Sequence, residues 1–319
     1  MILVTGGAGF IGSALVWQLN QLGIENILVC DHLGTSSKWL NLRSLRFLDY
    51  IEKDHLSDCL KDLQLQHVFH LGACSSTTES DCSYLIKNNF EYSKMLAKHC
   101  LRQNIPMIYA SSAATYGDGS LGFSDKISLV SLRPLNAYGY SKHMFDLWLE
   151  KHGILNRFTG IKFFNVWGPN EYHKGDMQSM VVKAFHQIME TGRVKLFKSH
   201  NRDYQDGYQL RDFIYVKDVT RCLIEFYKSP QTTGIFNLGN GSPVAWVDLI
   251  EPIFSALNKP VQFEFVPMPE ELRNRYQYYT CADMLKYEES GLKRFQTPLN
   301  DTIYDFVQNY LVPGKFLES

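Results

Sequence analysis

Tyr138 and Lys142 lie four residues apart in the stretch Asn-Ala-Tyr-Gly-Tyr-Ser-Lys. On a helix, this spacing brings two side chains onto one face. A phenol with its ordinary pKa of about 10 is a poor base at neutral pH, but a neighbouring ammonium group favours the phenolate and lowers that pKa. The pair is therefore a candidate acid/base unit for removing the proton of an alcohol. The same spacing also occurs on solvated helices without a function, so other parts of the chain must supply the rest of a site.

A glycine motif at the start of the chain supplies one such part. Residues 1–5 are a short β-type run that leads into Gly6, Gly9 and Gly12, and residues 10–22 have a helical pattern. Strand, glycine turn and helix in this order are typical of a dinucleotide site, because glycines let the backbone approach a pyrophosphate and the helix N-terminus presents N–H groups. The spacing G-x-x-G-x-x-G differs from the G-x-G-x-x-G of most dehydrogenases. A plain tight turn is the alternative interpretation.

The next predicted strand, residues 26–31, ends in Asp31, about 20 residues beyond the glycines. An acid at this place usually binds the ribose hydroxyls of NAD. Lys38 and Lys53 follow, and either could meet the 2′-phosphate of NADP instead. The residues alone leave both cofactors open.

Strand-like and helix-like segments alternate through the first half of the chain. Further strands are predicted at residues 46–52, 67–71, 106–112 and 159–165. A long helical pattern that carries Asn88 and Asn89 covers about residues 81–103. This alternation predicts an α/β fold with a Rossmann-type doubly wound parallel sheet.

The pattern changes after residue 168, where loops rich in glycine and charged residues interrupt short elements. One more buried strand and two amphipathic helices are predicted at residues 234–238, 245–257 and 298–311. We interpret this part as a smaller mixed α/β substrate-binding domain. The predicted domains are an NADP-binding Rossmann domain, residues 1–167 plus about 213–240, and a substrate-binding domain, residues 168–212 plus 241–319.

Two segments at the carboxyl ends of predicted strands complete the candidate site. Residues 72–78 form a small, hydroxyl-rich loop, and Ser112 closes the strand that precedes the Tyr138 helix. Open α/β sheets bind ligands at this edge. Ser112 can hydrogen-bond a substrate hydroxyl, Tyr138 can take its proton, and Lys142 can hold Tyr138 and the nicotinamide ribose. Hydride transfer is the cofactor's chemistry, so these residues indicate an oxidoreductase-type site.

The composition limits the class of protein. The 319 residues carry a formal net charge of −1 and are 45% hydrophobic, which favours one large or two linked domains and indicates neither a nucleic-acid nor a membrane partner. No apolar run reaches the 18 or so residues that span a bilayer, and no signal-peptide pattern is present, so we expect a cytoplasmic protein. The seven cysteines include no C-x-x-C pair and the ten histidines form no ligand cluster. We expect reduced thiols and no metal.

Together these motifs resemble the extended short-chain dehydrogenase/reductase superfamily. Within it, the chain is similar to the ADP-L-glycero-D-manno-heptose 6-epimerase family from residue 1 to about residue 310. The stretches that carry the resemblance are residues 6–12, 72–79, 109–117, 138–142, 164–166, 173–175, 211–216, 234–239 and 275–277. Several of these also occur in other sugar-nucleotide epimerases. The run Gly-Ala-Cys-Ser-Ser-Thr-Thr-Glu at 72–79 and the His-Lys-Gly block at 173–175 are the specific ones.

The resemblance implies an isomerase that acts at C6 of the heptose in ADP-D-glycero-D-manno-heptose and uses NADP, in the synthesis of a lipopolysaccharide core precursor. Inverting a secondary alcohol through a ketone requires hydride to leave one face of the carbon and return to the other. The ketone must therefore turn, and a second acid/base group can serve the second orientation. In the family this group is the lysine of the His-Lys-Gly block, which implies Lys174. By its sequence surroundings alone, Lys174 lies in a polar loop and is typical of a solvated surface charge.

The resemblance assigns roles position by position, with Tyr138, Lys174, Ser112 and Lys142 as the catalytic residues. The cofactor-binding residues indicated by the glycine motif and the resemblance are Gly6, Gly9, Phe10, Ile11, Gly12, Asp31, His32, Lys38, Lys53, Leu71, Gly72, Ala73, Cys74, Ser75, Asn88, Lys142, Val166 and Lys174. The substrate-binding residues are Ser112, Asn165, Asp176, Lys183, Phe197, Lys198, Ser199, His200, Arg211 and Tyr276. The family's preference for NADP agrees with Lys38 and Lys53, and the family forms homo-oligomers.

Two of these substrate residues have an evident chemical role. The fork of donors on Arg211 suits a diphosphate, and Tyr276 can stack on or hydrogen-bond the nucleotide. A structural ion pair for Arg211 and a core position for Tyr276 are the alternatives.

Four features depart from the family pattern. Asp176 stands where serine is usual, Lys183 where histidine is frequent, and Trp167 where tyrosine is frequent, and the segment 201–208 is expanded. An acid beside a diphosphate is unfavourable, which argues against a direct contact from Asp176. These departures concern the periphery of the substrate site and not the reaction centre.

Two rival functions stay open on the sequence. Another sugar-nucleotide enzyme of the superfamily, such as a 4-epimerase or a reductase, can work through Tyr138 alone and has little need of Lys174. A dinucleotide-binding regulator without catalysis has no need of Ser112, Tyr138 and Lys142 together.

Overall fold

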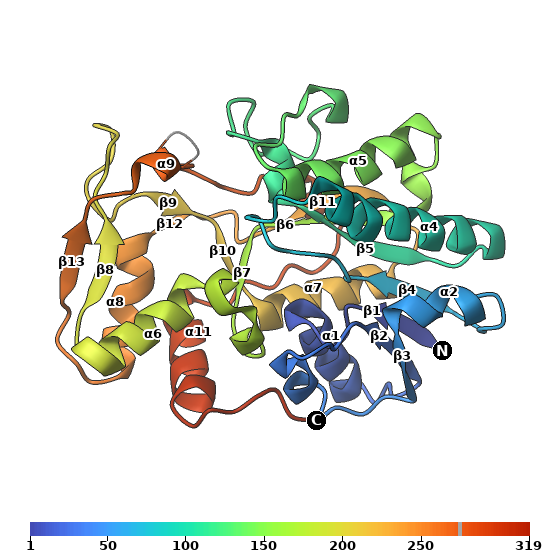
Figure 1. Ribbon diagram of the computed structural model, residues 1–319, viewed down its shortest axis with the longest axis horizontal. Helices are drawn as coiled ribbons and strands as arrows, with labels where there is room; N and C mark the ends of the chain where they lie inside the picture. The colour runs from blue at the N-terminus through green and yellow to red at the C-terminus, as the bar shows by residue number, and fades with distance from the viewer. Residues whose placement is uncertain (274–275) are drawn as a thin grey trace.

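A seven-stranded, fully parallel sheet forms the centre of the computed structural model, which describes residues 1–273 and 276–319 (Figure 1). Arg275 of the 275–277 stretch lies outside these ranges. The strands, in the order of the sheet, are β11 (Gly234–Leu238), β6 (Thr159–Phe163), β5 (Met107–Ser112), β4 (His67–His70), β1 (Ile2–Thr5), β2 (Ile27–Asp31) and β3 (Asp49–Glu52). The chain builds outward from β1 to β3 and then returns to β4 on the other side of β1. This confirms the predicted Rossmann-type doubly wound sheet.

Helices cover both faces of the sheet, so β1, β2, β4 and β11 are buried throughout, whereas the edge strand β3 is only partly buried. One hydrophobic core lies between the sheet and α1, α7 and α10, and another lies between the sheet and α2, α4 and α5. Figure 1 shows α4 and α5 on one side of the sheet and α1 and α7 on the other. The bounds are α1 (Phe10–Gln21), α7 (Val216–Lys228), α10 (Leu285–Glu289), α2 (Leu56–Cys59), α4 (Tyr92–Gln103) and α5 (Ala137–Lys151).

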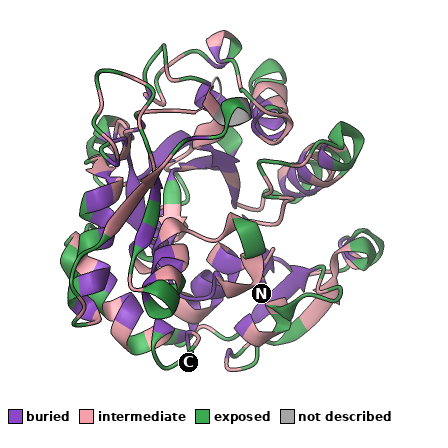
Figure 2. Ribbon diagram, turned by 60° about the vertical axis from the view of Figure 1, so that its left-hand side comes forward, coloured by how far each residue is buried: buried purple, intermediate pink, exposed green. Residues whose placement is uncertain are grey.

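A separate hydrophobic core organises the second part of the chain around α6, α8 and α11 and the strand pair β8–β13. Two further pairs, β7 with β10 and β9 with β12, connect this part to the sheet region. The bounds are α6 (Met180–Thr191), α8 (Trp246–Ala256), α11 (Leu299–Phe306), β8 (Val194–Phe197), β13 (Phe263–Val266), β7 (Asn165–Trp167), β10 (Phe213–Tyr215), β9 (Leu210–Arg211) and β12 (Val244–Ala245). The short α9 spans Glu270–Arg273. Figure 2 shows the buried segments inside and the exposed ones at the periphery.

The proposed division into two domains stays a prediction. Trp167, Phe213 and Tyr215 pack in the core of the second part, although the sequence division assigns them to the Rossmann domain.

Three predicted elements differ from the structure in their bounds. The strand expected from residue 46 begins only at Asp49, because the backbone N–H of Arg46 donates to the side chain of Asn20 instead of joining the sheet. The strand expected over 159–165 ends at Phe163, and Asn165 pairs with Phe213 of β10. The helix expected over 81–103 is α3 (Cys82–Leu85), a π-helical turn at Ile86–Glu91 and α4.

Within the described ranges, no helix is long and apolar enough to cross a membrane. No three His, Cys, Asp or Glu side chains in the same ranges come together in a way that could hold a metal ion.

Candidate active site

The glycine motif forms a tight junction between β1, α1 and the loop after β4. Gly6 has φ of +69°, and a Cβ atom placed on it would lie 2.6 Å from the backbone of Gly72. A Cβ atom on Gly12 would overlap the carbonyl oxygen of Gly6. The G-x-x-G-x-x-G spacing therefore lets the start of α1 approach the backbone of the turn, as a pyrophosphate cradle requires. Among the described residues, no side chain caps the first turn of α1 after Gly9.

Asp31 ends β2 beside this junction, and its carboxylate is fully engaged by the chain. It accepts hydrogen bonds from the backbone N–H of Ala8 (2.9 Å) and of His32 (2.7 Å). The ammonium group of Lys38 lies 2.7 Å from the same carboxylate and neutralises it. Asp31 thus stabilises the glycine turn, and Lys38 is held at the edge where the sequence predicts the adenosine end of the cofactor.

The neighbouring predicted cofactor residues are also paired. Lys53 Nζ donates to Asn88 Oδ1 at 2.5 Å. The His32 ring lies 2.5 Å from Glu52. Hydrogen bonds from Tyr50 and His32 outweigh the effect of burial and lower the pKa of the Glu52 carboxyl. The end of β2 is therefore surrounded by two lysines and by the His32–Glu52 pair.

Asn89 connects two parts of the candidate site, although its sequence position indicated no role for it. It is fully buried, its Oδ1 accepts from the backbone N–H of Cys74 at 2.8 Å, and its Nδ2 donates to the carbonyl of Cys74 and to the hydroxyl of Ser141. It therefore ties the loop after β4 to the helix that carries Tyr138. A π-helical turn contains Asn89, and such turns are frequent at functional sites, but the sequence pattern predicted an ordinary helix.

Ser112 and Tyr138 meet at the carboxyl end of β5. Asn136 caps α5 by accepting a hydrogen bond from the backbone N–H of Gly139 at 2.7 Å, so Tyr138 lies in the first turn of the helix. Burial raises the pKa of the Tyr138 phenol, and a hydrogen bond with Ser112 opposes this rise. The expectation that a neighbouring ammonium group lowers the pKa of Tyr138 is therefore wrong for the net shift, because burial is its largest cause.

Lys142 lies one turn further along α5 and is buried. Its Nζ donates to the carbonyl of Ala110 on β5 at 2.8 Å. Burial lowers the pKa of Lys142 to about 8, and the nearby Asp146 carboxylate opposes this change. Lys142 is therefore an ammonium group at neutral pH that can lose its proton in mildly alkaline solution.

Lys174 is half-buried in the short helical segment Tyr172–Met177 and not on the open surface. Its Nζ lies 5.1 Å from the centre of the Phe10 ring, which begins α1. Burial lowers the pKa of Lys174, and the buried carboxylate of Glu171 opposes this effect. The hydroxyl of Thr77 also reaches Met177, which joins this segment to the loop after β4. Lys174 thus lies at the same edge of the sheet as the glycine turn.

Asp176 and Lys183 contact each other at the edge of this segment. Lys183 Nζ donates to the backbone carbonyl of Asp176 at 2.7 Å, and Asp176 is exposed. Their predicted role in substrate binding stays a prediction.

Arg211 and Tyr276 form the centre of the predicted substrate region. The guanidinium of Arg211 lies 5.0 Å from the centre of the Tyr276 ring and donates to the carbonyls of Leu210 and Gln277. The Tyr276 hydroxyl accepts from Trp246 Nε1 at 3.0 Å. Gln277 in turn donates to the carbonyl of Gly117, in the loop after β5. A chain of contacts therefore connects Arg211 to the loop that follows Ser112.

The predicted substrate residues 197–200 leave β8 in a turn that two side chains hold. Asp206 accepts from the backbone N–H of Ser199 at 2.7 Å, and the Tyr278 hydroxyl accepts from the backbone N–H of His200 at 2.9 Å. The expanded segment 201–208 thus supports this turn. Asn165 on β7 presents an exposed side chain.

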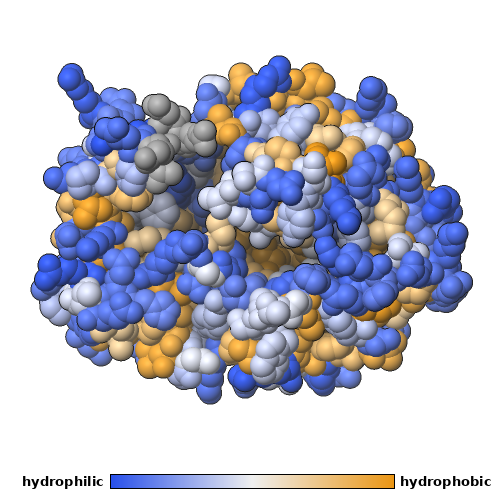
Figure 3. Space-filling view, viewed as in Figure 1, coloured by the Kyte–Doolittle hydropathy of each residue, from blue (hydrophilic) through white to orange (hydrophobic). Residues whose placement is uncertain are grey.

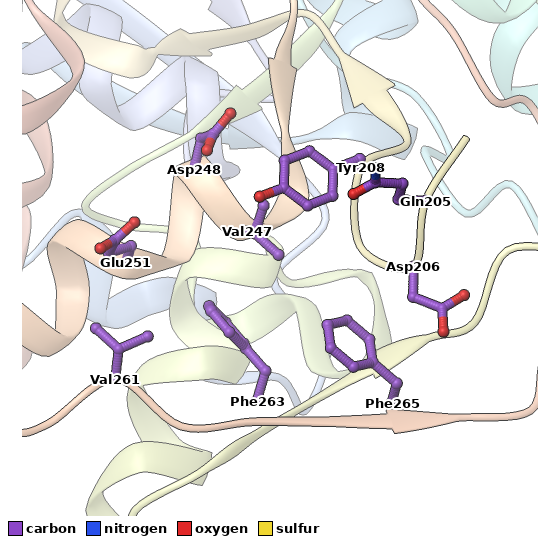
Figure 4. Close-up of a pocket in the computed structure, with 9 residues that line it drawn as sticks. All are labelled: Gln205, Asp206, Tyr208, Val247, Asp248, Glu251, Val261, Phe263 and Phe265. Carbon is purple, nitrogen blue, oxygen red and sulfur yellow. The ribbon is translucent and has the colours of Figure 1, made fainter. Parts of the chain in front are cut away.

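The face drawn in Figure 3 has a recess with an apolar floor near its middle. A different, open pocket of about 610 Å³ lies over α8 and β13, lined by Tyr208, Val247, Phe263, Phe265 and four polar or acidic residues among others (Figure 4). The sequence assigned a site role to none of the residues that line it. In this chain, therefore, the volume of a pocket does not indicate where the predicted catalytic residues lie.

The structure places several of the predicted residues in two groups. The glycine turn, Asp31, Lys38, Gly72 and Lys174 lie around the start of α1, and Ser112, Tyr138 and Lys142 lie where α5 meets the end of β5. Both groups are at the carboxyl edge of the parallel sheet, where open α/β folds bind ligands. Such an arrangement can hold a dinucleotide and exchange a proton with an alcohol.

Known proteins match this chain along nearly its whole length. The sequence profile of the NAD dependent epimerase/dehydratase family matches residues 2–239. A Nitratidesulfovibrio vulgaris protein named ADP-L-glycero-D-manno-heptose-6-epimerase is 48% identical over 316 residues, with 98% of each chain covered. A Fusobacterium nucleatum protein of the same name is 46% identical, also with 98% of each chain covered. The crystal structure of a Helicobacter pylori protein of that name has a TM-score of 0.80 and 25% identity, covering 97% of this chain and 95% of the other.

Proposed function

Because this chain belongs to the NAD dependent epimerase/dehydratase family, we propose that it inverts C6 of the heptose in ADP-D-glycero-D-manno-heptose to give ADP-L-glycero-D-manno-heptose. The reaction oxidises C6 to a ketone and reduces it again on the opposite face, so no net redox change results. The relatives at 46–48% identity carry the name of this activity. We further propose that it acts in the synthesis of a lipopolysaccharide core precursor.

The residues around the start of α1 fit a nicotinamide dinucleotide. Gly6 and Gly12 keep free the space that a Cβ atom would fill, and the first turn of α1 presents its N–H groups to the same side. Such a cofactor takes hydride from the carbinol carbon and gives it back. We propose NADP as the cofactor, because Lys38 neutralises Asp31 and so reduces the repulsion that this acid would exert on a 2′-phosphate.

Tyr138 and Lys174 supply the proton transfers in this proposal. The Tyr138 phenolate, which is the form that burial disfavours, takes the proton of the C6 hydroxyl as the ketone forms, and Ser112 hydrogen-bonds the same oxygen. After the ketone has turned, the Lys174 ammonium gives its proton to the oxygen of the re-formed alcohol. Solvent then restores the two groups to their starting protonation states. Burial lowers the pKa of Lys174, which suits a lysine for acid/base work near neutral pH.

The observation that carries the proposal is the position of Lys174. A solvated surface lysine would not lie half-buried against Phe10 and beside the buried Glu171. A dehydrogenase needs Tyr138 alone, whereas an epimerase that turns its ketone has a use for a second acid/base group.

The test is to give the purified protein ADP-D-glycero-D-manno-heptose and to resolve the two C6 epimers by NMR. We expect interconversion by the wild type and by the control Lys195→Met, whose side chain is 60% exposed on β8. We expect a loss of inversion in both Tyr138→Phe and Lys174→Met. A wild type that does not invert C6, or a Tyr138→Phe variant that inverts it at the full rate, contradicts the proposal.

The Lys174 variant distinguishes the rival enzymes. If Lys174→Met keeps full activity on another sugar nucleotide, a 4-epimerase or reductase that works through Tyr138 is the better assignment. If no sugar nucleotide is turned over while NADP still binds, a regulatory role is the better assignment. Releasing the cofactor by denaturation and measuring its mass decides between NADP and NAD.

We also propose a cytoplasmic homo-oligomer. Light scattering of the purified protein would give the mass of the assembly, and a monomer contradicts this part of the proposal.

A further inference from the structure

A buried carboxylate stands directly behind Lys142. Asp146 lies on α5 one turn after Lys142 and is fully buried. Its two oxygens accept hydrogen bonds from the hydroxyl groups of Tyr109 (2.9 Å) and Ser111 (2.6 Å). Burying an ionised carboxylate is unfavourable unless hydrogen bonds and a counter-charge compensate for the lost water. The burial of the Asp146 carboxylate therefore needs a structural or functional explanation.

The donors to Asp146 come from the strand that ends in Ser112. Tyr109 and Ser111 are two apart on β5, so their side chains lie on the same face of the strand, towards α5. Between them, the carbonyl of Ala110 accepts the hydrogen bond from Lys142. Three hydrogen bonds from adjacent residues thus hold α5 against β5, and Ser112 is the next residue of the strand.

The adjacent strand β6 contributes both space and a positive charge to this cluster. Gly160 pairs with Tyr109 in the sheet, and a Cβ atom on Gly160 would overlap the Tyr109 hydroxyl. Burial raises the pKa of Asp146. Lys162 pairs with Ser111, is buried, and is the strongest of the interactions that oppose this rise and favour the charged form of Asp146. The counter-charge comes from a different strand than the hydrogen bonds, so the cluster joins β5, β6 and α5.

We propose that Asp146 is a positioning residue for the reaction at Tyr138: it holds α5 in register with β5, and its negative charge keeps Lys142 in the ammonium form. This inference rests on the proposed function, because it concerns the same site. Asp146 touches neither substrate nor cofactor in this scheme and acts through Lys142.

The charges around Lys142 predict the direction in which loss of the Asp146 charge would shift the pKa of Lys142. Asp146 on the same helix and Cys74 in the loop after β4 raise the pKa of Lys142, while burial lowers it to about 8. On β4, His70 faces Lys142, and burial keeps this histidine neutral with a pKa of about 3. Around Asp146 itself the charged groups are Lys142 and Lys162, and Lys162 also faces Asp125 and Lys286. Removing the charge of Asp146 should therefore lower the pKa of Lys142 further.

The first experiment compares Asp146→Asn with the wild type in C6 inversion across pH. We expect the alkaline limb of kcat to move by about one pH unit towards lower pH, since a charge within one helical turn shifts a pKa by about that amount or more. The KM for the substrate should stay within about twofold, because Asp146 does not reach the substrate. An unchanged alkaline limb overturns the proposal.

The matched control is Asp218→Asn on α7, a buried carboxylate that accepts two hydrogen bonds from Thr297. It should lose stability to a similar degree without any shift of the alkaline limb. If both variants shift the limb equally, the effect is a general loss of stability and the proposal fails. Tyr109→Phe removes one donor and keeps the charge, so it should lower kcat without moving the limb.

A second measurement needs no substrate. The side-chain signal of Lys142 is followed by NMR in protein labelled with ¹³C-lysine and is assigned by its loss in Lys142→Met. A titration midpoint about one pH unit lower in Asp146→Asn supports the proposal, and an unchanged midpoint overturns it. A wild type that does not invert the heptose contradicts the proposed function, and this titration still tests Asp146.

Discussion

The two sides of the candidate site are held in different ways. Where α5 meets β5, Ser112, Lys142 and Asp146 are all at most 8% exposed. Hydrogen bonds from Ser111 to Asp146 and from Lys142 to the carbonyl of Ala110 join the two elements. On the substrate side, the turn at 197–200 is held through its backbone N–H groups, and Lys198 and His200 remain exposed. The difference shows that the core of the sheet fixes the proposed reacting groups, whereas surface segments support the turn that we propose for substrate recognition. Changes on the first side should affect kcat and folding, and changes on the second should affect KM.

The largest effect is expected for Tyr138→Phe. Loss of the phenolic oxygen removes the proposed base and should lower kcat by about 10³-fold, within the range for general acid–base catalysis. The ring stays in place, so KM should change little. Steady-state kinetics of C6 inversion give both constants, and a fall in kcat of less than tenfold contradicts this role.

The second effect is a test of the buried network on the same side. Asn89→Ala removes three hydrogen bonds that join Cys74 and Ser141, and should lower the free energy of unfolding by about 3 kcal/mol. Urea denaturation measures this change. Asn88→Ala is the neighbouring control, because the side chain of Asn88 is only half-buried and its partners are Lys53 and the carbonyl of Tyr84. Equal losses in the two variants would show that Asn89 has no special structural role.

On the substrate side, Arg211→Lys should raise KM by about tenfold and leave kcat within about twofold. Lysine keeps the charge but loses the planar fork that suits a diphosphate. Substrate saturation curves for inversion measure both constants. If kcat falls and KM does not, Arg211 belongs to the reaction centre and the contrast between the two sides is wrong.

The smallest effect is expected for Tyr276→Phe. The ring that lies over Arg211 remains, and only the hydrogen bond from Trp246 is lost, so KM should rise by about threefold. The same saturation curves measure this. Tyr276→Ala removes the ring as well and should have the larger effect, and an equal effect of the two variants would exclude stacking on the ring.

Local sequence patterns predicted the sheet because their causes are local. The apolar run of β1 and the glycines of the turn each act within a few residues, and each appears where it was expected. The ends of β3 and β6 were predicted less well. They depend on partners far along the chain, namely Asn20 for Arg46 and Phe213 for Asn165.

The sequence by itself determined the order of the chemical groups: a glycine turn, a serine at a strand end, a Tyr/Lys pair one helical turn apart and a second lysine further on. The first three follow from residue types at short spacing, and the second lysine is implied by the resemblance to a known family. Only the tertiary structure decided their electrostatic state. Burial raises the pKa of Tyr138 and lowers those of Lys142 and Lys174. Burial depends on what other strands and helices place around a group. For that reason a spacing of four residues predicted the pair but not its charge.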